Sequence, residues 1–263
     1  MTAAIDKEMH YGFMPGCSLS SYHPEAVIKT AAYLDSVLPK FSAVLKCCGK
    51  PTRDMGQYDL FKERFAGLIS DLEDVDIEEM IFACPNCKAV FEKESSVKSY
   101  SLWEILPLTG LPKELRGKAK DSDMVFTIHD SCSARHDKET QDGIRWILRE
   151  LGYQYVESAY SREKTKCCGY GGMVNPVNPG LTKKVMQRRA ETLENRPAVT
   201  YCSTCRSALM QAGLRAWHIL DLIWGPVVYA QDEPKPDILQ TPADVWHNRY
   251  VTRKGLSEAL GIK

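Results

Sequence analysis

Lys46-Cys47-Cys48-Gly49 and Lys166-Cys167-Cys168-Gly169 are two copies of one tetrapeptide, 120 residues apart. Each copy has one cysteine upstream and a Cys-x-x-Cys motif downstream. The first set is Cys17, Cys47, Cys48, Cys84 and Cys87, and the second is Cys132, Cys167, Cys168, Cys202 and Cys205. Equivalent cysteines lie 115, 120 and 118 residues apart, and the two sets contain all ten cysteines of the chain. This correspondence predicts two copies of one structural unit.

Apolar runs alternate with helical patterns in the same order in both units. Strands are expected at 11–14, 41–45 and 80–83, and again at 124–128, 153–156 and 198–201. Helices are expected between them, because apolar residues there recur at helical spacing, as in Phe61, Phe65, Leu68 and Leu72. We therefore predict an α/β fold of two pseudo-symmetric, Rossmann-like units with mostly parallel sheets.

Every cysteine group follows a predicted strand. In an open α/β sheet, ligands bind in the crevice outside the carboxyl ends of the strands. The cysteine-rich loops of one unit are therefore expected to meet at one edge of its sheet.

The predicted boundaries follow from this repeat. The first cysteine-rich unit is expected at 8–107 and the second at 123–224. The glycine, proline and charged residues of 108–122 are typical of a linker. The repeat ends before a C-terminal tail at 225–263, in which short helices are expected at 242–248 and 255–260.

Composition excludes several classes of protein. The formal net charge is zero, which disfavours a nucleic-acid-binding protein. No window reaches the ~18 apolar residues of a membrane-spanning helix. The N-terminal residues show no signal-peptide pattern. We therefore expect a cytoplasmic protein, or one attached to a membrane only through partner subunits. In that compartment a patterned set of thiols binds metal or performs redox chemistry more often than it forms disulfides.

The number of cysteines per unit favours a cluster over a single ion. Thiolates select zinc, copper(I) or iron–sulfur clusters, but a structural zinc needs four ligands and each unit has five. Gly49 and Gly169 allow the backbone to fold closely around a larger group. A multi-iron cluster fits best; zinc in one unit and redox chemistry at the adjacent cysteines remain alternatives. The cysteine run of cubane ferredoxins is absent, so electrons are expected to come from a separate protein.

The complete pattern, over about residues 10–224, resembles the cysteine-rich CCG domain, and the chain is most similar to the B subunit of heterodisulfide reductase. The resemblance implies that the five cysteines of each unit hold one noncubane [4Fe–4S] cluster. It further implies that a disulfide is split between the two clusters. The expected partners are a ferredoxin-like iron–sulfur protein of the C-subunit type, a flavoprotein of the A-subunit type, and a small-molecule disulfide.

The second motif departs from many relatives of that family. Ser131 and Ser133 flank Cys132 where relatives show Pro and His. Arg135 follows Cys132 by three residues, whereas an arginine at four is common. These differences do not change the cysteines. They mean that the residues around the second site differ from those of many relatives.

Three functions are compatible with these residues. The first is reduction of a disulfide, such as that of coenzyme M and coenzyme B or a related thiol. The second is an electron relay in a quinone-linked dehydrogenase or a sulfite-reduction complex, without disulfide chemistry. The third is a zinc-stabilised scaffold.

Several other residues near the cysteines have a functional and a structural interpretation. His129 and His136 are proton-donor candidates, although hydrogen bonds to loop backbone are the favoured interpretation. Lys46 and Lys166 could offset cluster charge or be solvated. Tyr170-Gly171-Gly172, which has no equivalent after Cys48, is expected to mark a difference in access between the two sites. No catalytic residue beyond the cysteines is assigned.

Overall fold

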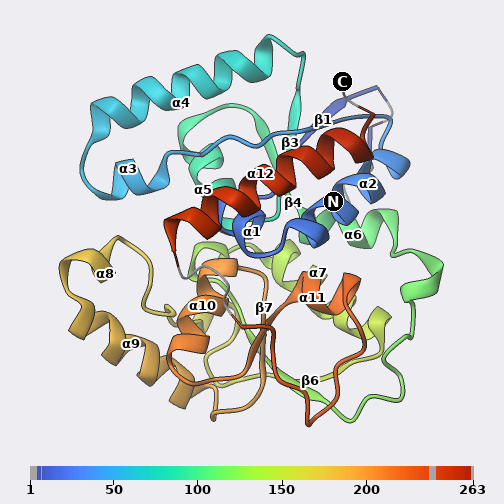
Figure 1. The fold of residues 1–263 in the computed structure, drawn as a ribbon, viewed down its shortest axis with the longest axis vertical. Coiled ribbons are helices and arrows are strands. Elements are labelled where there is room, and N and C mark those ends of the chain that lie inside the picture. Colours follow the sequence, from blue (N-terminus) through green and yellow to red (C-terminus); the bar gives the residue numbers. More distant parts are fainter. Residues whose placement is uncertain (1–4, 7, 237–240, 262–263) are drawn as a thin grey trace. The chain divides into compact units, whose positions relative to one another are not determined.

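The computed structural model describes residues 5–6, 8–236 and 241–261 (Figure 1). The chain divides into two compact units, one ending at Thr109 and completed by the C-terminal helix, the other beginning at Gly110. In each unit the described residues form a four-stranded, all-parallel sheet with helices. The predicted α/β fold of two repeated units is confirmed.

The first unit follows the predicted alternation of strands and helices. Its elements are β1 (His10–Met14), α1 (Cys17–Tyr22), α2 (Pro24–Val37), β2 (Lys40–Ala43), α3 (Lys50–Asp54), α4 (Tyr58–Glu73), β3 (Glu79–Phe82), α5 (Pro85–Glu94), β4 (Lys98–Ser101), α6 (Leu102–Thr109) and α12 (Pro242–Ala259).

The second unit repeats the plan with short 3₁₀ turns added. Its elements are η1 (Lys113–Leu115), β5 (Val125–His129), η2 (Cys132–Ala134), α7 (Lys138–Leu151), β6 (Gln154–Val156), η3 (Arg162–Lys164), α8 (Val174–Val177), α9 (Pro179–Thr192), β7 (Ala198–Thr200), α10 (Ser203–Gln211), β8 (Ala216–His218) and α11 (Ile219–Trp224).

The strand order places the cysteines. The sheets have the orders β2-β1-β3-β4 and β6-β5-β7-β8. In the first unit the chain moves from β1 to one side and then returns to the other, so β1 and β3 flank the switch point where ligands bind in such sheets. Cys17 and Cys84 follow these two strands directly, and Cys132 and Cys202 occupy the same places after β5 and β7.

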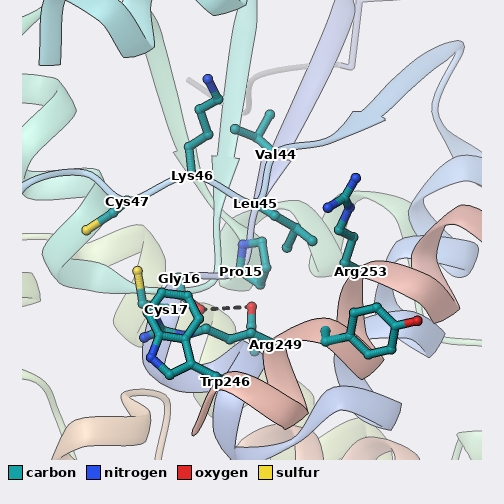
Figure 2. A pocket seen from close by; sticks show the side chains of 12 residues that line it. Pro15, Gly16, Cys17, Val44, Leu45, Lys46, Cys47, Trp246, Arg249 and Arg253 are labelled. Atoms are coloured by element: carbon teal, nitrogen blue, oxygen red, sulfur yellow. Dashed lines mark hydrogen bonds between the residues drawn. The ribbon is translucent and has the colours of Figure 1, made fainter. Parts of the chain in front are cut away.

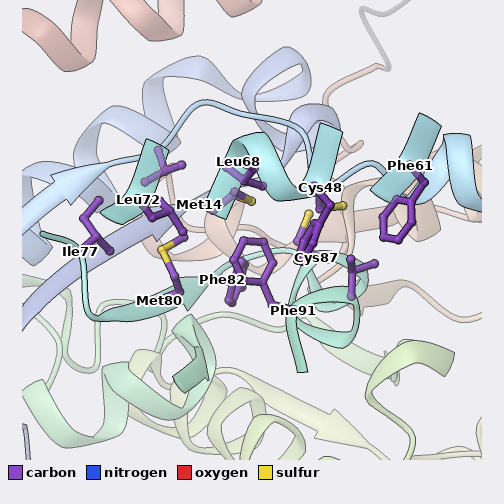
Figure 3. Packing of buried hydrophobic residues seen from close by; sticks show 13 residues of the cluster. Met14, Cys48, Phe61, Leu68, Leu72, Ile77, Met80, Phe82, Cys87 and Phe91 are labelled. Atoms are coloured by element: carbon purple, nitrogen blue, oxygen red, sulfur yellow. The ribbon is translucent and has the colours of Figure 1, made fainter. Parts of the chain in front are cut away.

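Burial explains why these segments form the elements. All residues of β1 and β3 are buried, as expected for a parallel sheet covered on both faces. On α4 the buried positions are Phe61, Phe65, Leu68 and Leu72, the stripe that the sequence predicts. Figure 3 shows Leu68 and Leu72 of this stripe over the sheet, and Cys48 and Cys87 side by side between Phe82 and Phe61. The first cysteine site therefore adjoins a rigid aromatic core.

The edge strands β4 and β8 are absent from the sequence prediction. β4 consists of Lys98-Ser99-Tyr100-Ser101, a polar four-residue run with no apolar stretch to identify it. β8 has three residues, and its Trp217 contacts Phe126 edge to face at 5.5 Å. Both are defined by pairing with β3 and β7, which the local sequence does not encode.

The segments predicted as linker and tail are packed against the units. Lys118 Nζ donates hydrogen bonds to the carbonyls of Ile223 and Gly225 at 2.9 and 2.8 Å, and Ala119 is fully buried. The two short helices expected in the tail are one helix, α12, which runs along α1 and α2 (Figure 1). Because Gly255 lies against Ile28, a glycine that suggests an interruption in the sequence permits close packing instead.

None of the helices in the described part of the chain combines the length and the apolar character needed to cross a bilayer.

Candidate metal centre

The five cysteines of the first unit converge at the carboxyl edge of its sheet. Their side chains hydrogen-bond in an unbroken series, in the order Cys17, Cys47, Cys48, Cys87 and Cys84. Cys48 and Cys87 are buried, Cys17 and Cys84 are half-buried, and Cys47 is exposed. The loops after β1, β2 and β3 thus deliver five sulfur atoms to one place, as the sequence predicts.

Two glycines make this convergence sterically feasible. Gly16 has φ +89°, and a Cβ there would lie 2.7 Å from the Cβ of Cys84. Gly49 has φ +74°, and a Cβ there would lie 2.9 Å from the ring of Phe61. Both positions combine a backbone conformation that favours glycine with a close approach that excludes a side chain.

The thiols of this set differ in acidity. Hydrogen bonds with Cys17 and Cys48 lower the pKa of Cys47 to about 2, against the effect of burial. The interaction with Cys47 raises the pKa of Cys17 and, together with burial, raises that of Cys48 to about 12. A hydrogen bond with Cys87 and backbone N–H groups at the start of α5 lower the pKa of Cys84 to about 7. The site therefore stabilises negative charge on the sulfurs of Cys47 and Cys84, and thiolate is the form in which cysteine binds metal.

The second unit repeats the arrangement. Its thiols hydrogen-bond in the order Cys132, Cys167, Cys168, Cys205 and Cys202. Contacts with Cys132 and Cys168 lower the pKa of Cys167 to about 2. The backbone N–H of Gly169 donates to the Cys167 sulfur at 3.3 Å. Cys168, Cys202 and Cys205 are buried, so this set is the more enclosed of the two.

A buried histidine lies against the second set of thiols. A ring nitrogen of His129 and the sulfurs of Cys168 and Cys205 lie within 4.8 Å of one another. Nε of Arg189 donates to His129 Nδ1 at 3.0 Å. Because a guanidinium is only a donor, Nδ1 must accept and the ring proton must be on Nε2. Burial, followed by the charge of Arg189, lowers the pKa of His129 to about 3, so the ring is neutral.

This geometry makes His129 a hydrogen-bond donor rather than a metal ligand. Its Nε2 is buried and has no hydrogen-bond partner among the described residues. With its proton fixed there, the nitrogen offers no lone pair to a metal but can donate to a sulfur. The hypothesis that His129 bonds loop backbone is wrong, since its partner is the Arg189 side chain.

A buried ion network holds the loops around the second set. Arg145 donates to both oxygens of Asp130 at 2.9 and 2.8 Å and to both oxygens of Glu157 at 2.7 and 2.8 Å. The Thr165 hydroxyl donates to the Asp130 carbonyl at 2.7 Å. Asp130 lies two residues before Cys132 and Thr165 two residues before Cys167, so this network fixes one loop against the other.

The sequence does indicate these two arginines, but both lie among apolar residues at helical spacing and are easily overlooked. Arg189 lies in the buried stripe of α9 with Met186 and Ala190, at helical spacing. Arg145 lies in the same way among the buried residues of α7. An arginine at a buried helical position requires a partner, and that requirement could have identified both.

The remaining predicted residues have mixed outcomes. Lys46 pairs with Asp71 on the surface. Lys166 Nζ lies over the ring of Tyr160, 3.4 Å from its centroid. His136 is exposed and lines a pocket that contains no cysteine. No described contact joins any of these three side chains to a cysteine sulfur.

α12 is the element of the first site that sequence reasoning missed. A pocket of about 430 Å³ opens on Cys17 and Cys47, and residues of α12 form one wall (Figure 2). The second unit has no counterpart of α12 among its described residues.

The donor set fits a sulfur-ligated metal cluster. Each unit offers five thiols at one locus, more than a tetrahedral zinc requires. In each set, hydrogen bonds with neighbouring thiols lower the pKa of one cysteine, Cys47 or Cys167, which favours the thiolate form. In the first unit, Gly16 leaves the loops close enough to share one group.

Comparison with known proteins agrees with this arrangement. The model of the cysteine-rich CCG domain matches residues 11–92 and again residues 126–210. The two matches together cover more than half of the chain, and each contains one complete cysteine set.

Several curated relatives are named as iron–sulfur proteins or as parts of a reductase. The chain is 24% identical over 77% of its length to an uncharacterized iron–sulfur protein of Methanocaldococcus jannaschii. It is 31% identical over 75% to a probable iron–sulfur-binding oxidoreductase of Bacillus subtilis. It is 22% identical over 76% to the D subunit of the dihydromethanophenazine:CoB–CoM heterodisulfide reductase of Methanosarcina barkeri. The chain spans 41%, 30% and 53% of the lengths of these relatives, respectively.

Proposed function

The chain belongs to the CCG cysteine-rich domain family, and from that premise we propose that it is a disulfide-reducing iron–sulfur protein. Each unit would hold one noncubane [4Fe–4S] cluster through its five cysteines. The observation that supports this most directly is the convergence of five thiols at the switch point of each sheet.

The proposed ligands of the first cluster are Cys17, Cys47, Cys48, Cys84 and Cys87. Those of the second are Cys132, Cys167, Cys168, Cys202 and Cys205. When bound, such a cluster supplies one-electron storage and iron atoms with an affinity for thiolate sulfur.

The residues of the chain have separate tasks in this proposal. The start of α5 directs backbone N–H groups at Cys84 and stabilises its thiolate. Cys17 and Cys47 form the side of the first set that faces the pocket, so a substrate sulfur would approach there. His129 keeps its proton on Nε2, which has no partner among the described residues and would donate to a sulfur of the second site once a cluster is bound.

The reaction balances with an external electron source. The S–S bond of the substrate breaks, two electrons enter, and two protons from solvent complete two thiols. The chain itself has no cysteines beyond the two sets, so we propose an iron–sulfur partner protein as the electron donor. A flavoprotein would supply that partner in turn. The similarity to one component of heterodisulfide reductase supports this assignment.

Viologen-driven reduction of a disulfide panel tests the proposal. The protein is purified without oxygen, and thiol release is followed with dithionite-reduced methyl viologen as donor. The panel contains the disulfide of 2-mercaptoethanesulfonate, oxidised glutathione and cystamine. We expect thiol release from at least one anionic disulfide.

Two outcomes of the same preparation would contradict the proposal. If the iron-loaded protein passes electrons from reduced viologen to other acceptors but releases no thiol from any disulfide, it would be an electron relay. Protein that contains zinc in place of iron would be a scaffold. A membrane attachment through partner subunits would be tested by fractionating cells with and without the partner genes.

A further inference from the structure

The pocket beside the first cysteine set lies entirely within the first unit. Its volume is about 430 Å³, and its described lining residues are Pro15, Gly16, Cys17, Ser20, Val44, Leu45, Lys46, Cys47, Trp246, Arg249, Tyr250 and Arg253. Figure 2 shows Cys17 and Cys47 at one end of the pocket and Arg253 at the other. A ligand that fills it would extend from the thiols to this arginine.

One face of α12 forms the wall of the pocket. Trp246, Arg249, Tyr250 and Arg253 recur at intervals of three and four residues, which places them on the same side of a helix. All four belong to the pocket lining. They lie outside the two segments that match the family model, which end at residue 210.

The other side of α12 anchors the helix. The buried Thr252 hydroxyl donates to the Ser20 carbonyl at 2.7 Å, and Asn248 Nδ2 donates to the Ser21 carbonyl at 2.7 Å. A Cβ at Gly255 would lie 2.2 Å from Ile28 Cδ1, so the helix is in close contact with α2. These contacts hold the arginines of α12 at the pocket without using their charges.

The charge of the pocket has one sign. Its described lining contains Lys46, Arg249 and Arg253 and no acidic residue. Lys46 is paired with Asp71. Neither arginine has a carboxylate partner among the described residues, although Arg249 Nε donates to Ser21 Oγ at 2.9 Å. Arg249 Cζ lies 5.2 Å from the centre of the Trp246 ring, and its charge acts on Cys17 and Cys47. Arg253 lies at the other end of the pocket (Figure 2) and offers its N–H donors to a carboxylate, sulfonate or phosphate.

The pocket also has an apolar surface. Trp246 is 67% exposed and Leu45 is 40% exposed, and Val44 lies beside them in the lining. An exposed tryptophan beside Arg249 favours a ligand with an aliphatic or other apolar segment. The pocket thus combines sulfur at one end, an apolar wall and two cations.

We propose that this pocket binds an anionic thiol or disulfide, with its sulfur toward Cys17, Cys47 and Arg249 and its acidic group on Arg253. This rests on the proposed function and specifies the substrate class and the unit that receives it. Substrate would enter at the first unit, because the described part of the second unit has no helix like α12.

Equilibrium binding to the iron-loaded full chain tests this inference without turnover. Isothermal titration without oxygen compares 2-mercaptoethanesulfonate, 3-mercaptopropionate, 2-mercaptoethanol and cysteamine, which share a short thiol chain and differ in charge. We expect the two anions to bind at least about tenfold more tightly than the neutral thiol and cysteamine to bind weakest. Raised salt should reduce the preference for the anions.

Substitutions on α12 supply the matched controls. Arg253→Gln should weaken binding of the anions by about tenfold or more and leave 2-mercaptoethanol unchanged. Arg249→Gln should weaken binding of the anionic and the neutral thiols alike, because its charge lies at the sulfur end of the pocket. Lys254→Gln removes the neighbouring charge, which lies outside the pocket and faces Glu258, and should leave all affinities unchanged. Iron content should equal that of the wild type in all three variants.

The results separate this inference from the proposed function. Equal affinity for anionic and neutral thiols, or no effect of either arginine substitution, overturns the pocket assignment even if disulfides are reduced. Arginine-dependent binding of anions in a protein that reduces no disulfide supports the pocket and contradicts the function.

Discussion

Met14-Pro15-Gly16-Cys17 and His129-Asp130-Ser131-Cys132 occupy the same place in the two units and differ at every residue before the cysteine. Met14 pairs with Phe82 in the first sheet, and His129 pairs with Thr200 in the second, two residues before the respective Cys-x-x-Cys motifs. In the first unit this segment supplies apolar core and a glycine turn. In the second it supplies a buried hydrogen-bond donor and a buried carboxylate.

The surroundings diverge in the same way. The first set of thiols is open on one side to a cationic pocket closed by α12. The second is enclosed by the His129–Arg189 pair and the Asp130–Arg145–Glu157 network. One repeated cysteine pattern thus has two environments, one open to a cationic pocket and one enclosed by buried side chains. The cysteine spacing is shared by the two units, whereas the residues between the cysteines set the polarity and the exposure of each site.

The largest expected effect comes from the buried network. Asp130→Asn weakens a fully buried ion pair with Arg145. It should lower the free energy of unfolding of the second unit by about 3 kcal/mol. This is the lower end of the range for a broken buried pair, because Glu157 still pairs with Arg145. Urea unfolding of the iron-loaded protein measures it. The control, Asp71→Asn, removes an exposed pair of the first unit and should cost less than about 1 kcal/mol. Equal losses of unfolding free energy in the two variants would contradict the claim that the second unit depends on a buried ion network.

The next effect concerns the turn before Cys17. Gly16→Ala should destabilise the first unit by about 2 kcal/mol and lower its iron content, because φ is +89° and the new Cβ meets Cys84. Gly56→Ala has a similar φ of +80° and open space, so it should cost about 1 kcal/mol with no loss of iron. Thermal unfolding and iron analysis measure both. If Gly56→Ala lost as much iron as Gly16→Ala, the contact of the new Cβ with Cys84 would not explain the loss of iron.

How much of this could be predicted from the sequence depends on what each feature requires. The paired cysteine sets and the strands that precede them are local patterns, so the repeat, the α/β class and the convergence of each set were predictable. The position of α12 was not, because Gly255 suggests a helix interruption until Ile28 is placed beside it. The Arg189–His129 pair joins residues 60 positions apart, and only the fold brings them together.

A smaller effect should distinguish the electronic environments of the two sets. His129→Met places the residue of the first unit in the second and removes the donor near Cys168 and Cys205. The reduction potential of the second site should fall on the order of tens of millivolts, since hydrogen bonds to sulfur stabilise the reduced state. Redox titration followed by electron paramagnetic resonance measures it. The potential of the first site is the internal control, and a shift confined to that site would contradict the assignment.

The smallest effect is a pH dependence at Glu157. Burial raises its pKa, but the hydrogen bond and charge of Arg145 outweigh this and the pKa is lowered from 4.5. A carboxyl with a depressed folded pKa stabilises the fold above the unfolded pKa, and this contribution is lost as pH falls through the folded value. The difference in urea midpoint between wild type and Glu157→Gln should therefore be steady near neutral pH and shrink only as the pH falls below 4.5 and through the lowered folded pKa. If the difference in urea midpoint did not change with pH, the ionisation of Glu157 would not contribute to stability.

Iron analysis of matched cysteine variants tests the central claim, one cluster per unit, most directly. Cys47→Ala/Cys48→Ala and Cys167→Ala/Cys168→Ala remove equivalent ligands from the two units. Wild-type protein prepared without oxygen should contain about eight irons, and each double variant about four, if each unit holds its own [4Fe–4S] cluster. Loss of all iron from either variant would show one shared site, and unchanged iron or the presence of zinc would contradict the assignment of the cysteines.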